Sequence, residues 1–583
     1  MTQDGFGRRA AGAVAASSRA ARAWISAAAP QPGTLRPDLI AGVPGAISGV
    51  PDGMAASVLA GVNPVHGLYA SVFGPIGGGL SSSTRLMVIT TTSAAALAAG
   101  SALDTTPAAD RPRALFLLTL IAGGVMIVAG LLRFGRYTRF VPHSVMIGFL
   151  SGVAVNIVLG QLPDLLGVPA TGPYPLAKAW DMLGNLKQIT VLSTVAGLAA
   201  LAILVVFTGT RFAPYASLVA LIVPSILVAA LSRDSVKLVQ DVGAIPRGLP
   251  APSIPHLSDL SFGVVVGALS VSALVLVQGA GVSESAPNPD RTRSSANQDF
   301  LAQGIGNVLA GLFRGQPVGG SVGRTALNVS AGARGRWATI ASGGWMAIIL
   351  LLFSGVVGHV VMSTLAAVLI VASVGSLRTG AVRAILRTGR ISQIAVIATF
   401  VATLFLPVAA AVGVGLVISL LMQLNQEALD LRIVELSPLP DGRFAERPAP
   451  RALASRRVLL LDVYGSLFYA GARTLQAHLP DPSGCEHPAV VLRLRGRAML
   501  GSTSFAVLSD YAQRLASVGG CLYLSGVDPA LLAQIRRNQT VEPAGQVRFF
   551  EATQVVGESS LSAYHAAQEW LAEVDDQPGR GDR

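Results

Sequence analysis

Apolar stretches dominate the chain between residues 39 and 424, where they follow one another with only short polar breaks. A helix needs roughly 20 apolar residues to cross the hydrocarbon core of a bilayer. The pattern therefore predicts an α-helical polytopic membrane protein with about fourteen transmembrane segments over residues 38–426, several of them short or interrupted. The predicted spans start near Leu39, Pro64, Leu86, Ala114, Ser144, Ile189, Tyr215, Phe262, Phe300, Ser321, Trp337, Leu365, Ile391 and Val408.

Charges in the polar breaks indicate the orientation of the chain. Loops after even-numbered spans carry arginines, such as Arg133, Arg136 and Arg139, whereas loops after odd-numbered spans carry mixed charge. An excess of Lys and Arg marks cytoplasmic loops. Residues 1–37 are rich in Ala and Arg and lack the features of a signal peptide. We therefore expect a multi-pass protein of the cell (plasma or inner) membrane with a cytoplasmic N-terminal lead and a cytoplasmic C-terminus.

The character of the chain changes after Gln426. Four prolines between residues 438 and 450 predict a linker over 427–456. Short strand patterns then alternate with helical patterns over residues 457–573, which predicts a small cytoplasmic α/β domain. The polar residues 574–583 are expected to be a disordered tail.

Composition supports a membrane protein and excludes several other classes. Apolar residues make up 51% of the chain and charged residues only 13%, about half the roughly 25% of a soluble domain. The net charge of +12 fits basic cytoplasmic loops rather than nucleic-acid binding. Cys485 and Cys521 form no disulfide framework and suit a reducing compartment. Because no nucleophile, phosphate-loop or metal-ligand spacing stands out, we expect neither an enzyme nor a cofactor or metal site.

Asp52 is the first candidate functional residue, because it is an acid deep inside an apolar stretch, between Pro51 and Gly53. An ionisable residue at that depth costs several kcal/mol, so a role in transport or proton relay is the default hypothesis. The alternatives are an acid that caps a helix broken at Pro51, or one that lies close to the water interface.

Two interrupted segments form the second candidate. Residues 90–96 (Thr-Thr-Thr-Ser-Ala-Ala-Ala), which follow an extended stretch at 86–89, and residues 317–326 (Pro-Val-Gly-Gly-Ser-Val-Gly-Arg-Thr-Ala) each combine extended chain with a helix start. They lie in the third and tenth spans, which predicts inverted repeats of seven plus seven spans with a substrate site at the repeat interface. The alternatives are small residues used for close helix packing and an arginine that snorkels to the interface. The candidate substrate-binding residues are Thr91, Thr92, Ser93, Gly320, Ser321, Gly323 and Arg324.

The repeat also pairs Asp52 of the first span with a residue of the eighth. Gln278 is the polar residue in a similar position, within Leu-Val-Gln-Gly-Ala at 276–280. We include Gln278 among the candidate site residues; the alternative is an interhelical hydrogen bond.

Several motifs resemble the sulfate permease (SulP) anion-transporter family. They are residues 61–71 (Gly-Val-Asn-Pro-Val-His-Gly-Leu-Tyr-Ala-Ser), 130–135 with 139–149, and 323–328 with 331–334. The C-terminal α/β region resembles the family's STAS domain, so the likeness covers roughly residues 36–573. It implies a core domain that moves against a gate domain, as in uracil-permease-like folds, with substrate between the facing N-termini of the third and tenth helices. It also implies a homodimer.

The chain departs from the family pattern at the presumed site. Asp52 stands where the family usually has Gln, and Gln278 stands where it often has a Glu that serves cation coupling. The STAS loop, usually of an Asp-Ser-Ser/Thr-Gly type, reads Gly-Ser-Thr-Ser at 501–504. Compared with the family pattern, the acid therefore lies in the first span instead of the eighth, which makes Asp52 the candidate coupling residue.

The sequence thus predicts a membrane-embedded secondary active transporter of a small anion of the sulfate, bicarbonate, chloride or dicarboxylate class. Its resemblance implies exchange or symport with H⁺ or Na⁺. Two alternatives stay open at this point: a proton-coupled carrier of a neutral or weakly acidic solute such as a nucleobase, and a non-transporting membrane sensor that signals through the STAS-like domain.

Overall fold

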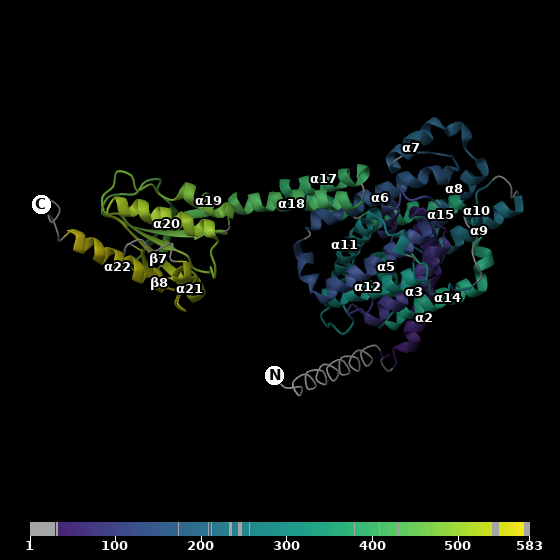
Figure 1. Cartoon of the computed structure of the whole chain (residues 1–583), viewed down its shortest axis with the longest axis horizontal. Coiled ribbons are helices and arrows are strands. Elements are labelled where there is room, and N and C mark those ends of the chain that lie inside the picture. The colour runs from purple at the N-terminus through teal and green to yellow at the C-terminus, as the bar shows by residue number, and fades with distance from the viewer. Residues whose placement is uncertain are drawn as a thin grey trace. The chain divides into compact units, whose positions relative to one another are not determined.

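The structure is a computed structural model that describes residues 29–575 apart from 31–32, 141, 173, 208, 211–212, 232–235, 243–247, 256, 378, 407, 430, 442, 468 and 539–546. Most of the predicted N-terminal lead and all but the first two residues of the predicted tail lie outside the described residues. The chain divides into two compact units, Met1–Ser419 and Leu420–Arg583, which we describe one at a time (Figure 1).

The first half of the helical unit contains a short strand between long helices. Its elements are α2 (Leu35–Leu59), α3 (Val65–Ser81), β1 (Ile89–Thr91), α4 (Ser93–Ala102), α5 (Arg111–Leu131), α6 (His143–Leu166), α7 (Pro175–Gly184), α8 (Val191–Phe207), α9 (Ala216–Leu231) and α10 (Val239–Val242), with 3-10 turns at Phe134–Phe140, Leu186–Gln188 and Ala213–Tyr215.

The second half repeats this order. Its elements are a 3-10 turn at Leu257–Asp259, α11 (Phe262–Ser285), α12 (Ala296–Leu312), β2 (Val318–Gly320), α13 (Val322–Ser330), α14 (Trp337–Val357), α15 (Met362–Ser376), α16 (Thr379–Thr388), α17 (Arg390–Phe405) and α18 (Val408–Leu429). Within the described part of the chain, five helices are long and apolar enough to cross a membrane by length and composition, and several shorter apolar helices accompany them. Each of the fourteen predicted spans coincides with a helix or a strand–helix pair, so the predicted fold class is confirmed.

The helices pack in two sets drawn from both repeats. In the core set, α12 packs on α5 and α3, and α14 packs on α2 and α3. In the gate set, α17 and α15 pack on α6, and α8 packs on α15 and α9. Glycines permit the closest approaches: a Cβ on Gly67 of α3 would lie 1.7 Å from the carbonyl oxygen of Gly53 in α2. Close contact at small residues is the usual way in which membrane helices associate.

The C-terminal unit is a six-stranded sheet covered by helices. Its strands lie in the order β4-β3-β5-β6-β7-β8; β3 is antiparallel to both neighbours, and the pairs from β5 to β8 are parallel. Helices α19, α20 and α21 supply the apolar core on one face, and α22 supplies it on the other. The elements are β3 (Arg432–Pro438), β4 (Phe444–Pro448), β5 (Val458–Tyr464), α19 (Tyr469–His478), β6 (Ala489–Arg493), α20 (Ser502–Ser517), β7 (Cys521–Val527), α21 (Pro529–Asn538), β8 (Val547–Glu551) and α22 (Glu558–Asp575).

The structure differs from the linker predicted over residues 427–456, because β3 and β4 lie in that segment. The linker was predicted from the prolines of this segment. Pro438 and Pro448 are instead the last residues of their strands, and β4 is an edge strand. Proline is tolerated at an edge because it removes no hydrogen bond from the interior of the sheet. The α/β unit therefore includes two strands that precede the expected boundary at residue 457.

Candidate functional site

The two interrupted segments meet as an antiparallel pair of short strands. Thr90 of β1 lies opposite Gly319 of β2, and Thr91 lies opposite Val318. Each strand leads directly into a helix: the Thr92 hydroxyl accepts a hydrogen bond from the Ala95 N–H at 3.3 Å to cap α4, and the Ser321 hydroxyl accepts one from the Arg324 N–H at 3.4 Å to cap α13. Two helix N-termini from opposite repeats therefore begin beside one strand pair, as predicted.

These helix starts offer backbone donors. The N–H groups of Ser93 and Ala94 in α4, and of Val322 and Gly323 in α13, make no hydrogen bond within the described part of the chain. The N-terminus of a helix also carries a partial positive charge. Free donors combined with that charge attract anions.

Arg324 lies in the first turn of α13 and turns toward α2 rather than toward the interface. Its Nη1 donates a hydrogen bond of 2.8 Å to the Gly45 carbonyl and another to the Ser48 hydroxyl. Its Nε lies 3.2 Å from Oδ2 of Asp52 without the alignment of a hydrogen bond. The residue is only 8% exposed, so it does not snorkel.

Asp52 lies in the middle of a continuous helix. Helix α2 runs through both Pro44 and Pro51, so Asp52 does not cap a helix that Pro51 breaks. Its side chain remains 35% exposed, although it contacts the buried Arg324. The Asp52 side chain is thus both ion-paired and partly exposed.

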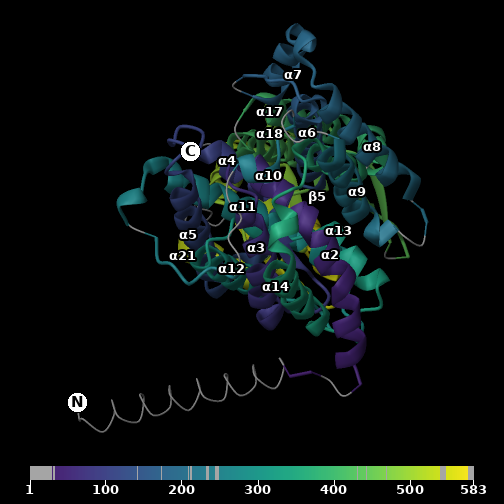
Figure 2. The same cartoon turned by 90° about the vertical axis from the view of Figure 1, so that its right-hand side faces the viewer.

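Gln278 forms the corresponding contact in the other repeat. The Thr92 hydroxyl donates to its Oε1 at 3.4 Å. Asp52 of α2 therefore pairs with the first turn of α13, and Gln278 of α11 pairs with the N-cap of α4. Figure 2 shows α13 beside α2 and α4 beside α11. The predicted correspondence between Asp52 and Gln278 matches this geometry, with a charged pair in one repeat and a neutral pair in the other.

A small cavity of about 10 Å³ borders Arg324, with room for about one water molecule. Ser71, Thr90 and Asn328 line it, and the buried Ser71 hydroxyl has no hydrogen-bond partner within the described residues. This space is too small for a polyatomic anion, so the cavity is not itself a substrate pocket.

Two buried amides hold the strand pair in place. They were not among the site residues predicted from the sequence. Gln303 and Asn307 of α12 are fully buried. The Gly320 N–H donates to Gln303 Oε1 at 3.1 Å, and Asn307 exchanges hydrogen bonds of 2.9 and 2.7 Å with the backbone of Val318. The available signal was two amides four residues apart in an apolar span, which places both on one helix face.

A buried carboxylate anchors the loop that leads into β1. Asp299 of α12 is 2% exposed, and its Oδ1 accepts hydrogen bonds from the Ser83 N–H at 2.7 Å and the Thr84 N–H at 3.0 Å. Its Oδ2 accepts a bond of 2.6 Å from the Thr84 hydroxyl. A carboxylate with several donors is satisfied although it is buried. We therefore assign Asp299 a role in positioning β1.

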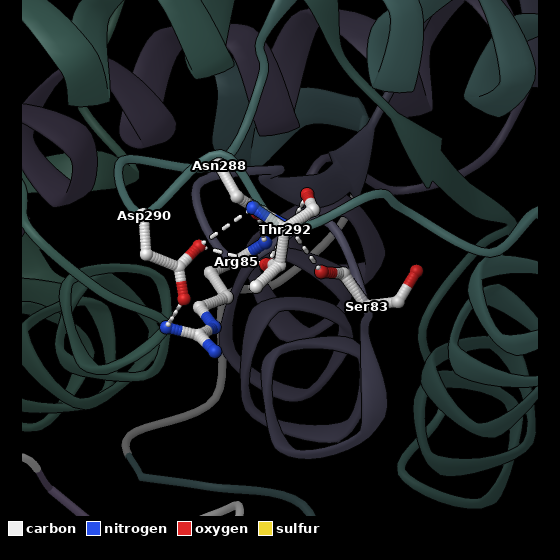
Figure 3. Close-up of polar contacts among 5 residues, drawn as sticks. All are labelled: Ser83, Arg85, Asn288, Asp290 and Thr292. Carbon is white, nitrogen blue, oxygen red and sulfur yellow. Dashed lines mark hydrogen bonds and ion pairs between the residues drawn. The ribbon is translucent and has the colours of Figure 1, made fainter.

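The loop between α11 and α12 holds the same segment from outside (Figure 3). Asn288 accepts a hydrogen bond of 2.8 Å from the Arg85 N–H and donates one of 3.0 Å to the Ser83 carbonyl. Arg85 forms an ion pair of 2.8 Å with Asp290. Donation from the Thr292 side chain and backbone, with Arg85 nearby, lowers the pKa of Asp290. The second repeat thus fixes the path into the first interrupted segment.

A sequence profile described as the sulfate permease family matches residues 35–402, which cover the first repeat, the whole strand pair and the second repeat as far as α17. The chain belongs to the sulfate permease family. Members of this family are transporters rather than enzymes, and the chain is accordingly a membrane transporter of small anions.

Curated relatives in the family are named either as sulfate transporters or as bicarbonate transporters. A putative sulfate transporter YvdB of Bacillus subtilis (strain 168) is 24% identical over 528 residues, which are 88% of this chain and 96% of the relative. The bicarbonate transporter BicA of Synechocystis sp. (strain ATCC 27184 / PCC 6803 / Kazusa) is 25% identical and aligns over 70% of this chain and 73% of its own length. The sulfate permease relatives therefore do not agree on one anion.

Solved structures share the fold. The structure titled "The overall structure of SLC26A9" superposes with a TM-score of 0.79 at 18% identity, over 93% of this chain and 91% of that one. The transmembrane domain of the cyanobacterial bicarbonate transporter BicA gives 0.58 at 22% identity, over 67% and 98%. The first match spans both units, which agrees with a sulfate permease fold that carries a STAS-like C-terminal domain.

Proposed function

We propose that this protein is a secondary active transporter that binds a small anion between the N-termini of α4 and α13. The observation that carries the proposal is the position of Arg324 in the first turn of α13, beside unpaired backbone N–H groups. Thr91, Thr92, Ser93, Gly320, Ser321 and Gly323 would line the site, and the Arg324 guanidinium would supply positive potential.

Unequal exposure of the two helix starts supports alternating access. Val322 and Gly323, the first two residues of α13, are exposed, whereas Ser93 and Ala94, the first two of α4, are half-buried and buried. The arginine-bearing loops favour cytoplasmic termini in the cell membrane, and α13 would then point to the cytoplasm. On that topology this conformation opens inward, and movement of the core set against the gate set would expose α4 instead.

We also propose that Asp52 can couple transport to protons. A proton on Asp52 removes the negative charge beside Arg324 and thus raises the positive potential that an anion meets. Binding of the proton and of the anion would therefore favour each other by the same factor, as thermodynamic linkage requires. Gln278 cannot serve this purpose because an amide does not titrate. Na⁺ coupling is the competing mechanism, and a homodimer in the lipid bilayer is the expected assembly.

Uptake into proteoliposomes tests the function. The full-length protein should accumulate at least one labelled anion from a panel of sulfate, bicarbonate, chloride and a dicarboxylate, and it should not accumulate uracil. Uptake of uracil alone would contradict the proposal in favour of a nucleobase carrier, and uptake of nothing would favour a membrane sensor.

The same vesicles test the coupling. Accumulation driven by an inward proton gradient should be lost in Asp52→Asn, while anion exchange survives. Asp104→Asn, the same change at an exposed residue in the loop after α4, is the control and should keep full accumulation. If Asp52→Asn accumulates anion as wild type does under a proton gradient and ignores a Na⁺ gradient, Asp52 is not the coupling residue.

A further inference from the structure

The side chains of the candidate site carry little formal charge. Of the candidate residues, only Asp52 and Arg324 are charged, and they form an ion pair with 3.2 Å between Oδ2 and Nε. The remaining candidates are Thr, Ser, Gly and Gln, which carry no formal charge. With Asp52 ionised, the side chains of the site therefore sum to zero.

The positive potential must then come mainly from the two helix starts. Each helix N-terminus is equivalent to roughly half an elementary charge, so the starts of α4 and α13 together supply about one. The ends of these helices are free to act on a ligand because the N–H groups of their first residues are unpaired within the described residues. The Nε group of the buried Arg324 is a further donor, and it has no hydrogen-bond partner among the residues that the structure describes.

A site of this kind balances one negative charge and not two. An anion with a second charge would leave that charge uncompensated in a partly desolvated place, which is costly. It would also meet the carboxylate of Asp52, which lies within ion-pair distance of Arg324 and belongs to a side chain that is 35% exposed.

We propose that Asp52 sets the charge class of the substrate, so that with this carboxylate ionised the site takes singly charged anions and discriminates against doubly charged ones. The substrate class is then a bicarbonate, a halide or a monocarboxylate, rather than sulfate or a dicarboxylate. This inference rests on the proposed function, because it assumes that an anion binds between α4 and α13.

Matched pairs of ligands isolate charge from shape. Methyl sulfate differs from sulfate, and monomethyl succinate from succinate, mainly by one charge. Affinities would be measured by ligand-induced thermal stabilisation of the full-length protein in detergent at about pH 8, well above the ordinary pKa of an aspartate. Chloride and bicarbonate serve as further singly charged ligands.

The wild-type protein should bind the singly charged member of each pair at least about tenfold more tightly. Asp52→Asn adds one positive charge to the site and should shift that ratio toward the doubly charged member by about tenfold or more, because one unit of charge at this range has that effect at an effective dielectric constant of about 20. Asp104→Asn changes the net charge equally at an exposed loop position and should leave the ratio unchanged.

A double variant covers the case in which Asp52→Asn leaves Arg324 unpaired and fails to fold. Asp52→Asn with Arg324→Gln keeps the side chains of the site neutral, so it should retain the wild-type order of preference. Equal or tighter binding of sulfate by the wild-type protein would overturn the charge-class proposal while leaving anion transport intact. Failure of every anion to bind would instead overturn the proposed function itself.

Discussion

Arg324 and Asp52 contact each other across the two repeats: Nε of the arginine, in the first turn of α13, lies 3.2 Å from Oδ2 of the aspartate in α2. The equivalent first-turn position in α4 is Ala95, and the residue of α11 that contacts the N-cap of α4 is Gln278. The two repeats therefore share a backbone arrangement but differ in charge. All of the formal charge at the candidate site is concentrated on one side of the strand pair.

Gly49 leaves the space in which the Arg324 side chain lies. A Cβ at this position would lie 2.9 Å from Nη2 of Arg324 and 2.6 Å from Cε of Met346. We expect Gly49→Ala to displace the guanidinium and to weaken anion binding severalfold, with little change in stability, because both contacted atoms are the ends of flexible side chains. Calorimetry and thermal unfolding in detergent measure both effects.

Gly344 in α14 is the matched control for this change. A Cβ there would meet no atom within 4 Å. Gly344→Ala should therefore leave anion affinity unchanged and stabilise the helix by up to about 1 kcal/mol. Equal affinities in wild type and Gly49→Ala would show that the position of Arg324 does not matter to the ligand.

Within the loop cluster of Figure 3, substitution of a buried residue should cost much more stability than substitution of an exposed one. Asn288 is 5% exposed, and its loss would leave the Arg85 N–H and the Ser83 carbonyl without a partner. Asn288→Ala should cost about 1–3 kcal/mol of stability. Asp290→Asn removes the exposed ion pair with Arg85 but keeps a side-chain oxygen that can accept from Thr292, so it should cost clearly less than Asn288→Ala. Thermal unfolding of both variants checks the contrast, and equal losses would contradict it.

Because the pKa of Asp290 is lowered, its contribution to the free energy of unfolding depends on pH. A carboxylate with a depressed folded-state pKa stabilises the protein above its unfolded pKa and loses that effect as the pH falls through the folded value. The difference in stability between wild type and Asp290→Asn should therefore shrink below about pH 4. A difference that grows on acidification would contradict the assigned contacts.

The position of β3 decides where the α/β unit can be removed. Truncation after Leu429, the last residue of α18, leaves no strand behind, whereas truncation after Ser437 leaves nearly all of β3 without its partners β4 and β5. An unpaired strand invites aggregation. In size-exclusion chromatography, the first variant should elute as a single species and the second should aggregate. Equal behaviour would mean that β3 does not depend on its partners.

The hydrophobic pattern was sufficient to predict the helical architecture, because the spans are apolar segments separated by recognisable polar breaks. The strand–helix breaks at Thr92 and Ser321 were also readable, since small polar residues precede both helices. Contacts between residues that are distant in the sequence could not be predicted from the hydrophobic pattern. Neither the hydrogen bonds from Gln303 to β2 nor the orientation of Arg324 toward Ser48 has a local signature. The strands β3 and β4 were missed because proline at a strand end resembles proline in a linker.

The most direct test of the account is the affinity of the preferred anion for Arg324→Ala and Arg324→Lys, measured by calorimetry on the full-length protein in detergent. Arg324→Ala should bind about tenfold to a hundredfold more weakly, because hydrogen bonds to charged groups contribute about 1.5–3 kcal/mol while the helix dipoles remain. Arg324→Lys should recover part of that loss, since an ammonium keeps the charge but not the planar fork. Wild-type affinity in a correctly folded Arg324→Ala protein would contradict the assignment of the site.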